Sequence, residues 1–117
     1  MGNPRAERVG RQILQEVSNL VEFELNDPRL ELATFTDVEM TPDLKIARIS
    51  FSKIGNEEQR LACGEGLAGA AGFLRREIGR RLRLKYVPEL RFEIDRSLDL
   101  ADKIARLTRS DGDDVGE

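Results

Sequence analysis

Apolar residues between positions 9 and 21 recur at the period of an α-helix. The spacings are four, four, three and one for Val9, Ile13, Val17, Leu20 and Val21, so these side chains share one side of a helix. Proline is tolerated in the first turn of a helix and disfavours the helical conformation of the residue before it. We therefore predict a first helix that begins near Pro4 and ends at the Asn26-Asp27-Pro28 turn.

The next two stretches alternate polar and apolar residues, which is the pattern of half-buried strands. In residues 32–40, the alternation sets Thr36, Val38 and Met40 against Asp37 and Glu39. In residues 44–52, it sets Ala47, Ile49 and Phe51 against Arg48 and Ser50. Thr41-Pro42-Asp43 between them is typical of a turn. The two stretches are thus predicted to pair as an antiparallel hairpin.

Helix signals return after this hairpin. Asn56 followed by Glu57 and Glu58 suits a helix start, because carboxylates stabilise the positive end of the helix dipole. The helix then meets three glycines, at positions 64, 66 and 69, and each costs about 1 kcal/mol relative to alanine in a helix interior. We expect close packing on the sheet to offset this cost.

Beyond Gly72 the pattern predicts a second, short helix, after a break at Ala70-Ala71-Gly72. Its apolar stripe, repeating every four residues, consists of Leu74, Ile78 and Leu82. Its opposite side carries Arg76, Arg80 and Arg83, while Arg75 and Arg81 flank the stripe. Pro88 then precedes a third strand with Leu90, Phe92 and Ile94 on one face, and residues 98–107 suit a closing helix.

The predicted order of elements is helix, strand, strand, helix, helix, strand. This order favours an α+β fold in which helices cover one face of a three-stranded sheet. A chain of 117 residues is long enough for one domain of this kind and too short for two of ordinary size.

The charge is unevenly distributed along the chain. The net charge is −3, from 19 basic and 22 acidic residues, but residues 110–117, SDGDDVGE, hold four of the acids and no base. The preceding part of the chain is close to neutral. We predict a folded domain over residues 1–109 and an acidic, disordered tail over residues 110–117.

The residue inventory argues against an enzyme. The chain has one cysteine and no histidine, which removes the usual partner of a cysteine nucleophile and the usual mixed metal site. No Walker A signature is present. We expect no catalytic residue, cofactor, metal or small-molecule substrate, and we expect Cys63 to be a buried small hydrophobe.

The hydropathy pattern argues against a membrane partner. No apolar run approaches 18 residues and no apolar segment follows the N-terminus, so neither membrane spanning nor secretion is indicated. The cytoplasm is the expected location. No heptad pattern or long apolar edge demands a dimer, so we expect a monomer.

Charge is inverted locally between Arg75 and Lys85, where five arginines and one lysine meet a single acid, Glu77. Arginine presents forked donors to phosphate and stacks on unpaired bases, so this cluster favours RNA binding. The candidate residues are Gly72, Arg75, Arg76, Arg80, Arg81, Arg83 and Lys85. The competing interpretation is an ordinary solvated helix face, and Gly72 has a second role open to it as a helix-packing glycine.

Five sequence segments in order resemble the ribosome-binding factor A family. They are Arg8-Val9, NDPRL at 26–30, VEMTPDLKIARISFS at 38–52, AAGFLRREIGRRLRLKYVPELRFEID at 70–95, and Ser97-Leu98. The resemblance covers nearly all of residues 8–107. It implies a type II KH-like domain in which a kink at Ala70, Ala71 and Gly72 replaces the GxxG loop of ordinary KH domains.

The resemblance also implies a function. It predicts a non-enzymatic assembly factor that binds the free 30S ribosomal subunit through 16S rRNA and assists its late maturation and 16S rRNA processing. A wider RNA footprint would include Arg5, Arg8, Arg11, Lys45 and Arg48, although each is also explained as ordinary surface charge. Two alternatives stay open: a general KH-like RNA-binding module, and a protein-interaction domain whose arginines meet an acidic partner.

Overall fold

The first helix, α1, forms as the apolar pattern predicts. The structure is a computed structural model that describes residues 3–97, and in it α1 spans Pro4–Phe23. Asn3 caps the helix, because its side-chain oxygen accepts hydrogen bonds from the backbone amides of Arg5 and Ala6. The predicted stripe is largely buried, with Ile13, Val17 and Leu20 fully so. A short 3-10 helix, η1 (Pro28–Leu30), follows the turn after α1.

The predicted hairpin is present. Strand β1 spans Ala33–Met40 and pairs in antiparallel register with β2, Ile46–Lys53. The β2 side chains predicted to share one face, Ala47, Ile49 and Phe51, are all buried beneath the helices. This strand therefore supplies the centre of the aliphatic core.

One face assignment in β1 was wrong. We predicted Thr36 on the same face as Val38 and Met40, but Thr36 is exposed and Phe35 is half-buried on the core side. The register shifts between Phe35 and Asp37, so Thr36 is the extra residue of a β-bulge and the alternation changes phase there. The Thr36 hydroxyl donates a hydrogen bond of 2.6 Å to Asp95, beyond the end of the third strand.

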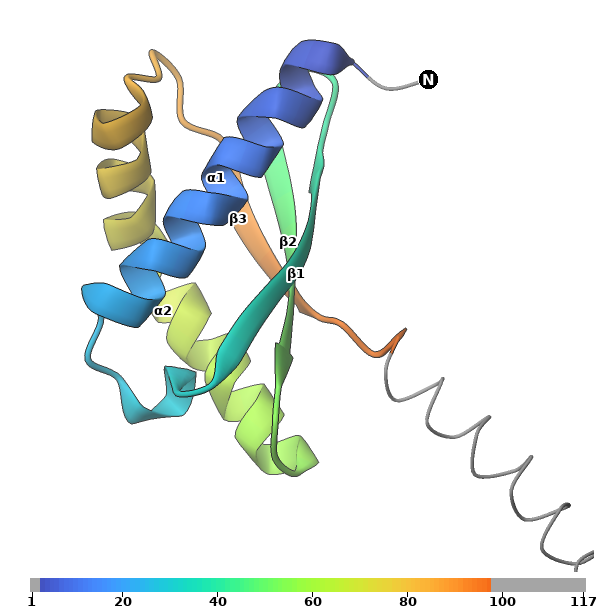
Figure 1. Ribbon diagram of the computed structural model, residues 1–117, viewed down its shortest axis with the longest axis vertical. Helices are drawn as coiled ribbons and strands as arrows, with labels where there is room; N and C mark the ends of the chain where they lie inside the picture. The colour runs from blue at the N-terminus through green and yellow to red at the C-terminus, as the bar shows by residue number, and fades with distance from the viewer. Residues whose placement is uncertain (1–2, 98–117) are drawn as a thin grey trace, which may run out of the picture.

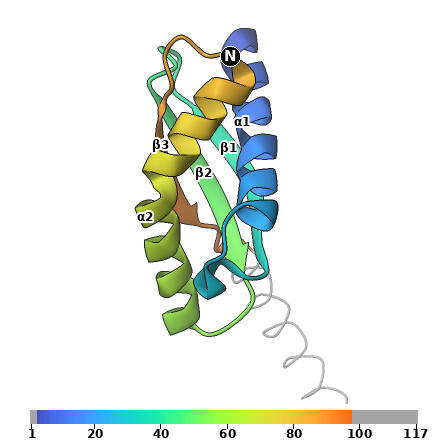
Figure 2. The ribbon, with the colours of Figure 1, turned by 90° about the vertical axis from the view of Figure 1, so that its left-hand side faces the viewer.

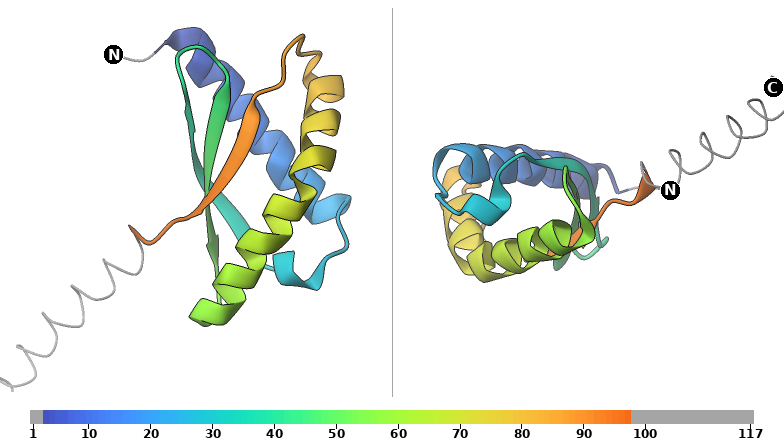
Figure 3. Two further views of the ribbon diagram at one scale, coloured as in Figure 1. Left: turned by 180° about the vertical axis from the view of Figure 1, so that it is seen from behind. Right: turned by 90° about the horizontal axis from the view of Figure 1, so that it is seen from below.

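The prediction of two helices separated by a break was also wrong. A single helix, α2, spans Glu57–Leu82 and includes Ala70, Ala71 and Gly72 without interruption. Figure 3 shows that the axis of this helix changes direction near its middle, where those residues lie. The helix therefore bends without losing its hydrogen-bonded continuity. Asn56 and Gln59 form a capping box at its start.

The glycines of α2 pack only in part as predicted. A Cβ atom at Gly66 would lie 3.0 Å from the Leu30 side chain, so this glycine allows close approach to η1 rather than to the sheet. A Cβ atom at Gly64 would lie 3.5 Å from Phe51 of β2, which is ordinary contact. Gly69 has open space around it. Close packing thus accounts for Gly66 and leaves Gly69 without a packing role.

The third strand, β3 (Glu89–Ile94), lies beside β2 and parallel to it, which gives the strand order β1-β2-β3. Helix α2 is the crossover that returns the chain for this parallel pairing. Figures 1 and 2 show α1 and α2 together on one face of the sheet. The α+β class with helices on one face is confirmed, and Cys63 is buried as predicted. The predicted helix at 98–107 and tail at 110–117 lie outside the described residues.

Candidate nucleic-acid interface

The second half of α2 carries the cluster of cations that the sequence singled out. Arg76, Arg80 and Arg83 are all exposed, as their predicted position opposite Leu74 and Ile78 requires. Within residues 3–97, the side chains of Arg76 and Arg83 have no hydrogen-bond or ion-pair partner. Their guanidinium groups are therefore available to an external anion.

Arg80 differs from these two residues because it is paired. Its guanidinium lies 2.5 Å from the Glu77 carboxylate, one turn earlier in α2, although 70% of the Arg80 side chain stays exposed. The hydrogen bond from Arg80 lowers the pKa of Glu77 and raises that of Arg80. Glu77 thus neutralises part of the outward face that a phosphate group would approach.

Arg81 joins the two helices. Its guanidinium lies 3.1 Å from the Glu24 carboxylate and 3.5 Å from that of Glu16, both contributed by α1 or its C-terminal cap, and 3.7 Å from Glu77. Three carboxylates around one guanidinium leave little capacity for a phosphate. The structure therefore gives Arg81 a role in holding α2 against α1.

Arg75 shapes the loop that follows α2. Its guanidinium donates hydrogen bonds to the backbone carbonyls of Val87, at 3.0 Å, and Pro88, at 3.1 Å. These carbonyls lie immediately before β3, so Arg75 fixes the chain as it turns back to the sheet. Pro88, which precedes the third strand as predicted, is buried at the same point.

Loop 83–88 is held at both ends. Arg83 caps α2 in the left-handed conformation, with φ 54°, and the amide of Leu84 donates to the Gly79 carbonyl at 3.0 Å. Val87 packs over Gly79 so closely that a Cβ atom there would lie 2.6 Å from its side chain. The loop presents Lys85 and Tyr86 outward, with the Lys85 ammonium 5.5 Å from the centre of the tyrosine ring.

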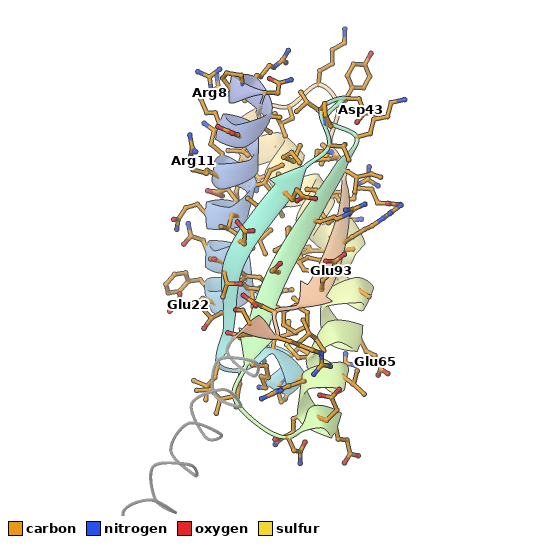
Figure 4. All side chains as sticks on the ribbon, turned by 90° about the vertical axis from the view of Figure 1, so that its right-hand side faces the viewer. Arg8, Arg11, Glu22, Asp43, Glu65 and Glu93 are labelled. Atoms are coloured by element: carbon orange, nitrogen blue, oxygen red, sulfur yellow. The ribbon has the colours of Figure 1, made fainter. Side chains whose placement is uncertain are left out.

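Loop 83–88 shares one end of the molecule with the start of α1 and the turn between β1 and β2 (Figure 1). Hydrogen bonds join these segments, from Asn3 to the Pro42 carbonyl and from the Glu89 amide to the Lys45 carbonyl. We call this the basic end, and its exposed cations are Arg5, Arg8, Lys45, Arg83 and Lys85. Three acids lie among or beside them, Glu7, Asp43 and Glu89, and Glu89 is paired with Arg91. Figure 4 shows Arg8 and Asp43 at this end.

Three other residues that were predicted to contact RNA lie outside the basic end: Arg11, Arg48 and Gly72. Arg11 lies one turn further along α1 than Arg8 (Figure 4). Arg48 points away from the helices, on the open face of the sheet, and pairs with Glu39 at 3.3 Å. Gly72 is exposed, and a Cβ atom there would meet only the Arg76 side chain at 3.7 Å, so helix packing does not explain this glycine.

Among the residues that the structure describes, the open face of the sheet carries no comparable cluster of cations. Arg91 is bound to Glu89 at 2.5 Å. Glu93, two residues further along β3 than Arg91, is also exposed (Figure 4). Across residues 3–97, no group of three acidic, histidine or cysteine side chains is placed to hold a metal ion. Over the same residues, no helix has the length and apolar content needed to span a bilayer.

Sequence reasoning missed three features of this region. It did not identify Glu16 and Glu24 as partners of Arg81, because they lie 65 and 57 positions away. It assigned Arg75 to RNA, whereas its visible bonds are to loop carbonyls. It also passed over Tyr86, although a lone tyrosine directly after a run of cations is a usable signal.

Comparison with known proteins agrees with this architecture. The family profile described as ribosome-binding factor A matches residues 5–108. Ribosome-binding factor A of Staphylococcus saprophyticus is 45% identical over 105 residues, covering 90% of this chain and 92% of that protein. The protein of the same name from Thioalkalivibrio sulfidiphilus is 48% identical, covering 89% and 78%.

Solved structures give the same result. The crystal structure of ribosome-binding factor A from Thermus thermophilus superposes with a TM-score of 0.61 at 25% identity, covering 79% of this chain and 92% of that one. A Thermus thermophilus model fitted into the map of a complex between the factor and the 30S subunit gives a TM-score of 0.64 at 25% identity, covering 76% and 93%. With a family profile and close relatives spanning most of its length, the chain belongs to the ribosome-binding factor A family.

Proposed function

We propose that this chain is a non-enzymatic assembly factor that binds the free small ribosomal subunit through 16S rRNA. It favours a late conformation of the maturing subunit in which the ends of the RNA can be processed, and it acts in the cytoplasm. Support comes from the family and from the relative whose structure was fitted into a complex with the 30S subunit.

The observation that carries the proposal is the set of cations that the fold leaves unused. Arg76, Arg83 and Lys85 follow one another along the outer side of α2 and into loop 83–88, and none has an acidic partner within residues 3–97. RNA phosphates fit such a surface because each contact releases bound counterions and needs no internal ion pair to be broken. Arg80 joins them on the same face, with part of its charge balanced by Glu77.

Co-sedimentation of the purified protein with ribosomal particles tests the proposal. We expect binding to free small subunits, little binding to complete ribosomes, and a steep loss of binding as salt is raised. The test variant combines Arg76→Gln, Arg83→Asn and Lys85→Gln. Asparagine is chosen at position 83 because it tolerates the left-handed conformation found there.

Arg91→Gln is the control, because Arg91 is also an exposed arginine but lies on the open face of the sheet. The triple variant should lower the salt slope by about 2–3 units, and the control should leave it unchanged. Equal binding to free subunits and complete ribosomes would contradict the assembly role. Equal affinity for unrelated structured RNAs would instead indicate a general RNA-binding module.

A further inference from the structure

Tyr86 is the most exposed large apolar side chain among those the structure describes. Its exposed fraction is 79%, and it lies at the tip of loop 83–88 on the basic end. A single exposed aromatic residue is common on protein surfaces and means little alone. Tyr86 differs from such residues because its loop is fixed and cations lie beside it.

The loop that carries Tyr86 is fixed on both sides of it. Before Tyr86, the Leu84 amide is bonded to the Gly79 carbonyl, and after it, Arg75 holds the carbonyls of Val87 and Pro88. The Glu89 amide then donates to the Lys45 carbonyl at 2.8 Å, which anchors the loop to the sheet. With its backbone held in this way, the tyrosine loses little additional freedom when a partner covers its ring.

The surroundings of Tyr86 favour an anionic partner. The Lys85 ammonium lies 5.5 Å from the centre of the ring, and Arg83 occupies the same loop without an internal partner. A flat aromatic face flanked by cations is the combination that binds single-stranded nucleic acid, because bases stack on the ring while the cations meet the phosphates.

Resting on the function proposed above, we propose that Tyr86 stacks on an unpaired nucleobase of the bound RNA, with Arg83 and Lys85 holding the adjacent phosphates. Arg75 acts in this interface as a positioning residue, because its guanidinium is bonded to the loop carbonyls of Val87 and Pro88. The surface thus recognises an unpaired nucleotide next to the backbone contacts made by α2.

The composition of the chain offers a direct measurement. The protein has one tyrosine and no tryptophan, so its intrinsic tyrosine emission comes from Tyr86 alone. We expect an unpaired RNA of about ten nucleotides to quench this emission as it binds, and a fully paired duplex of equal length to quench it much less. Free N-acetyltyrosinamide in the same solutions corrects for absorption by the RNA.

Substitutions test the energetic role of the ring. With the same labelled RNA, Tyr86→Ala should weaken binding about five- to 150-fold, the range found for loss of one stacked base. Tyr86→Phe should retain most of the affinity, and neither change should alter the salt slope, because no charge is removed. The control is Phe23→Ala, since Phe23 is 74% exposed but lies at the far end of α1, beside Glu22 and Glu24.

The outcomes separate the two proposals. If the labelled RNA binds but the emission is unchanged and Tyr86→Ala binds like the parent protein, the stacking role is refuted and the assembly function stands. If neither RNA nor free small subunits bind, both proposals fail together. Circular dichroism of each variant verifies that a lost affinity does not reflect a lost fold.

Discussion

The first half of α2, residues 57–69, and its second half, residues 70–82, both bury apolar side chains but carry opposite charge. The first half buries Cys63 and Leu67 and holds three acids against one base. The second buries Leu74 and Ile78 and holds four arginines against Glu77. Acids near the start of a helix and bases near its end also stabilise the helix dipole. The charge of a residue therefore does not show by itself whether that residue stabilises the fold or is available to bind a partner.

The hydrogen bonds and ion pairs that each charged side chain makes do distinguish these two roles. Arg75 binds two loop carbonyls and Arg81 joins three carboxylates, so the fold itself uses these arginines. Arg76 makes no such bond within residues 3–97. In a charged helix, the residues to examine for function are those that the folded protein does not employ.

The largest effect on stability that we expect is from Arg75→Gln. Its loss removes two charge-assisted hydrogen bonds to the Val87 and Pro88 carbonyls and should lower the free energy of unfolding by about 1–2 kcal/mol. Arg76→Gln, one residue further on, should change it by less than about 0.5 kcal/mol. Urea denaturation of both variants measures the difference. Equal effects would remove the distinction between the two arginines.

The glycines give a second, smaller contrast between the halves. A side chain at Gly79 would collide with Val87, at 2.6 Å, whereas Gly69 has open space around it. Gly79→Ala should cost about 1 kcal/mol of stability, since the strain exceeds the gain in helix propensity. Gly69→Ala should add about 0.5–1 kcal/mol. Thermal denaturation should thus move the two midpoints in opposite directions, and a shared direction would contradict the packing argument.

Two of the acidic residues of α2, one from each half, provide a test of binding. Glu77→Gln releases Arg80, and partly Arg81, from a carboxylate, so RNA affinity should rise about two- to fivefold and its salt dependence should steepen. Glu65→Gln removes the same charge from the first half, where Glu65 is exposed (Figure 4), and should leave affinity nearly unchanged. Fluorescence anisotropy with labelled RNA compares them. An equal gain in both would indicate a general effect of net charge.

The smallest effect that we expect is on stability at low pH. It arises at the end of the molecule where α2 begins. Hydrogen bonds from Ser97 and from the Thr36 hydroxyl hold the pKa of Asp95 at about 2, below its ordinary value of 3.8. Because the folded pKa is lowered, the stabilisation is complete above pH 3.8 and is lost as the pH falls towards 2. Urea midpoints across this range should fall less for Asp95→Asn than for the parent. Parallel curves would show that Asp95 contributes nothing.

Local patterns in the sequence were sufficient for most of the fold. The α1 stripe and the alternation of Ala47, Ile49 and Phe51 predicted their elements correctly, because each depends on neighbours in the chain. Alternation failed at Thr36, since a bulge shifts the phase without changing the composition. The break at Gly72 was wrong because glycine lowers helix propensity by only about 1 kcal/mol, which tertiary contacts readily exceed.

The candidate site was less accessible to sequence reasoning. The cluster of cations was visible, but which of them bind internal partners depends on tertiary structure. Glu24 meets Arg81 only once α1 and α2 are packed together, and Arg75 meets Val87 only once the chain has turned back towards β3. A count of charges assigned all these arginines to RNA, whereas the structure leaves Arg76 and Arg83 as the unpaired ones within residues 3–97.

The parallel pairing of β2 with β3 also has a consequence for the order of folding. The β1–β2 hairpin joins neighbouring segments, but β3 pairs with β2 only after the whole of α2 has been synthesised and folded back. Contacts between distant segments form slowly, because the chain between them must first be ordered. Loop 83–88 gains its anchor at Lys45 in that same step. A nascent or partly folded chain therefore lacks the complete basic end, and the surface that we propose for RNA binding is assembled only when β3 joins the sheet.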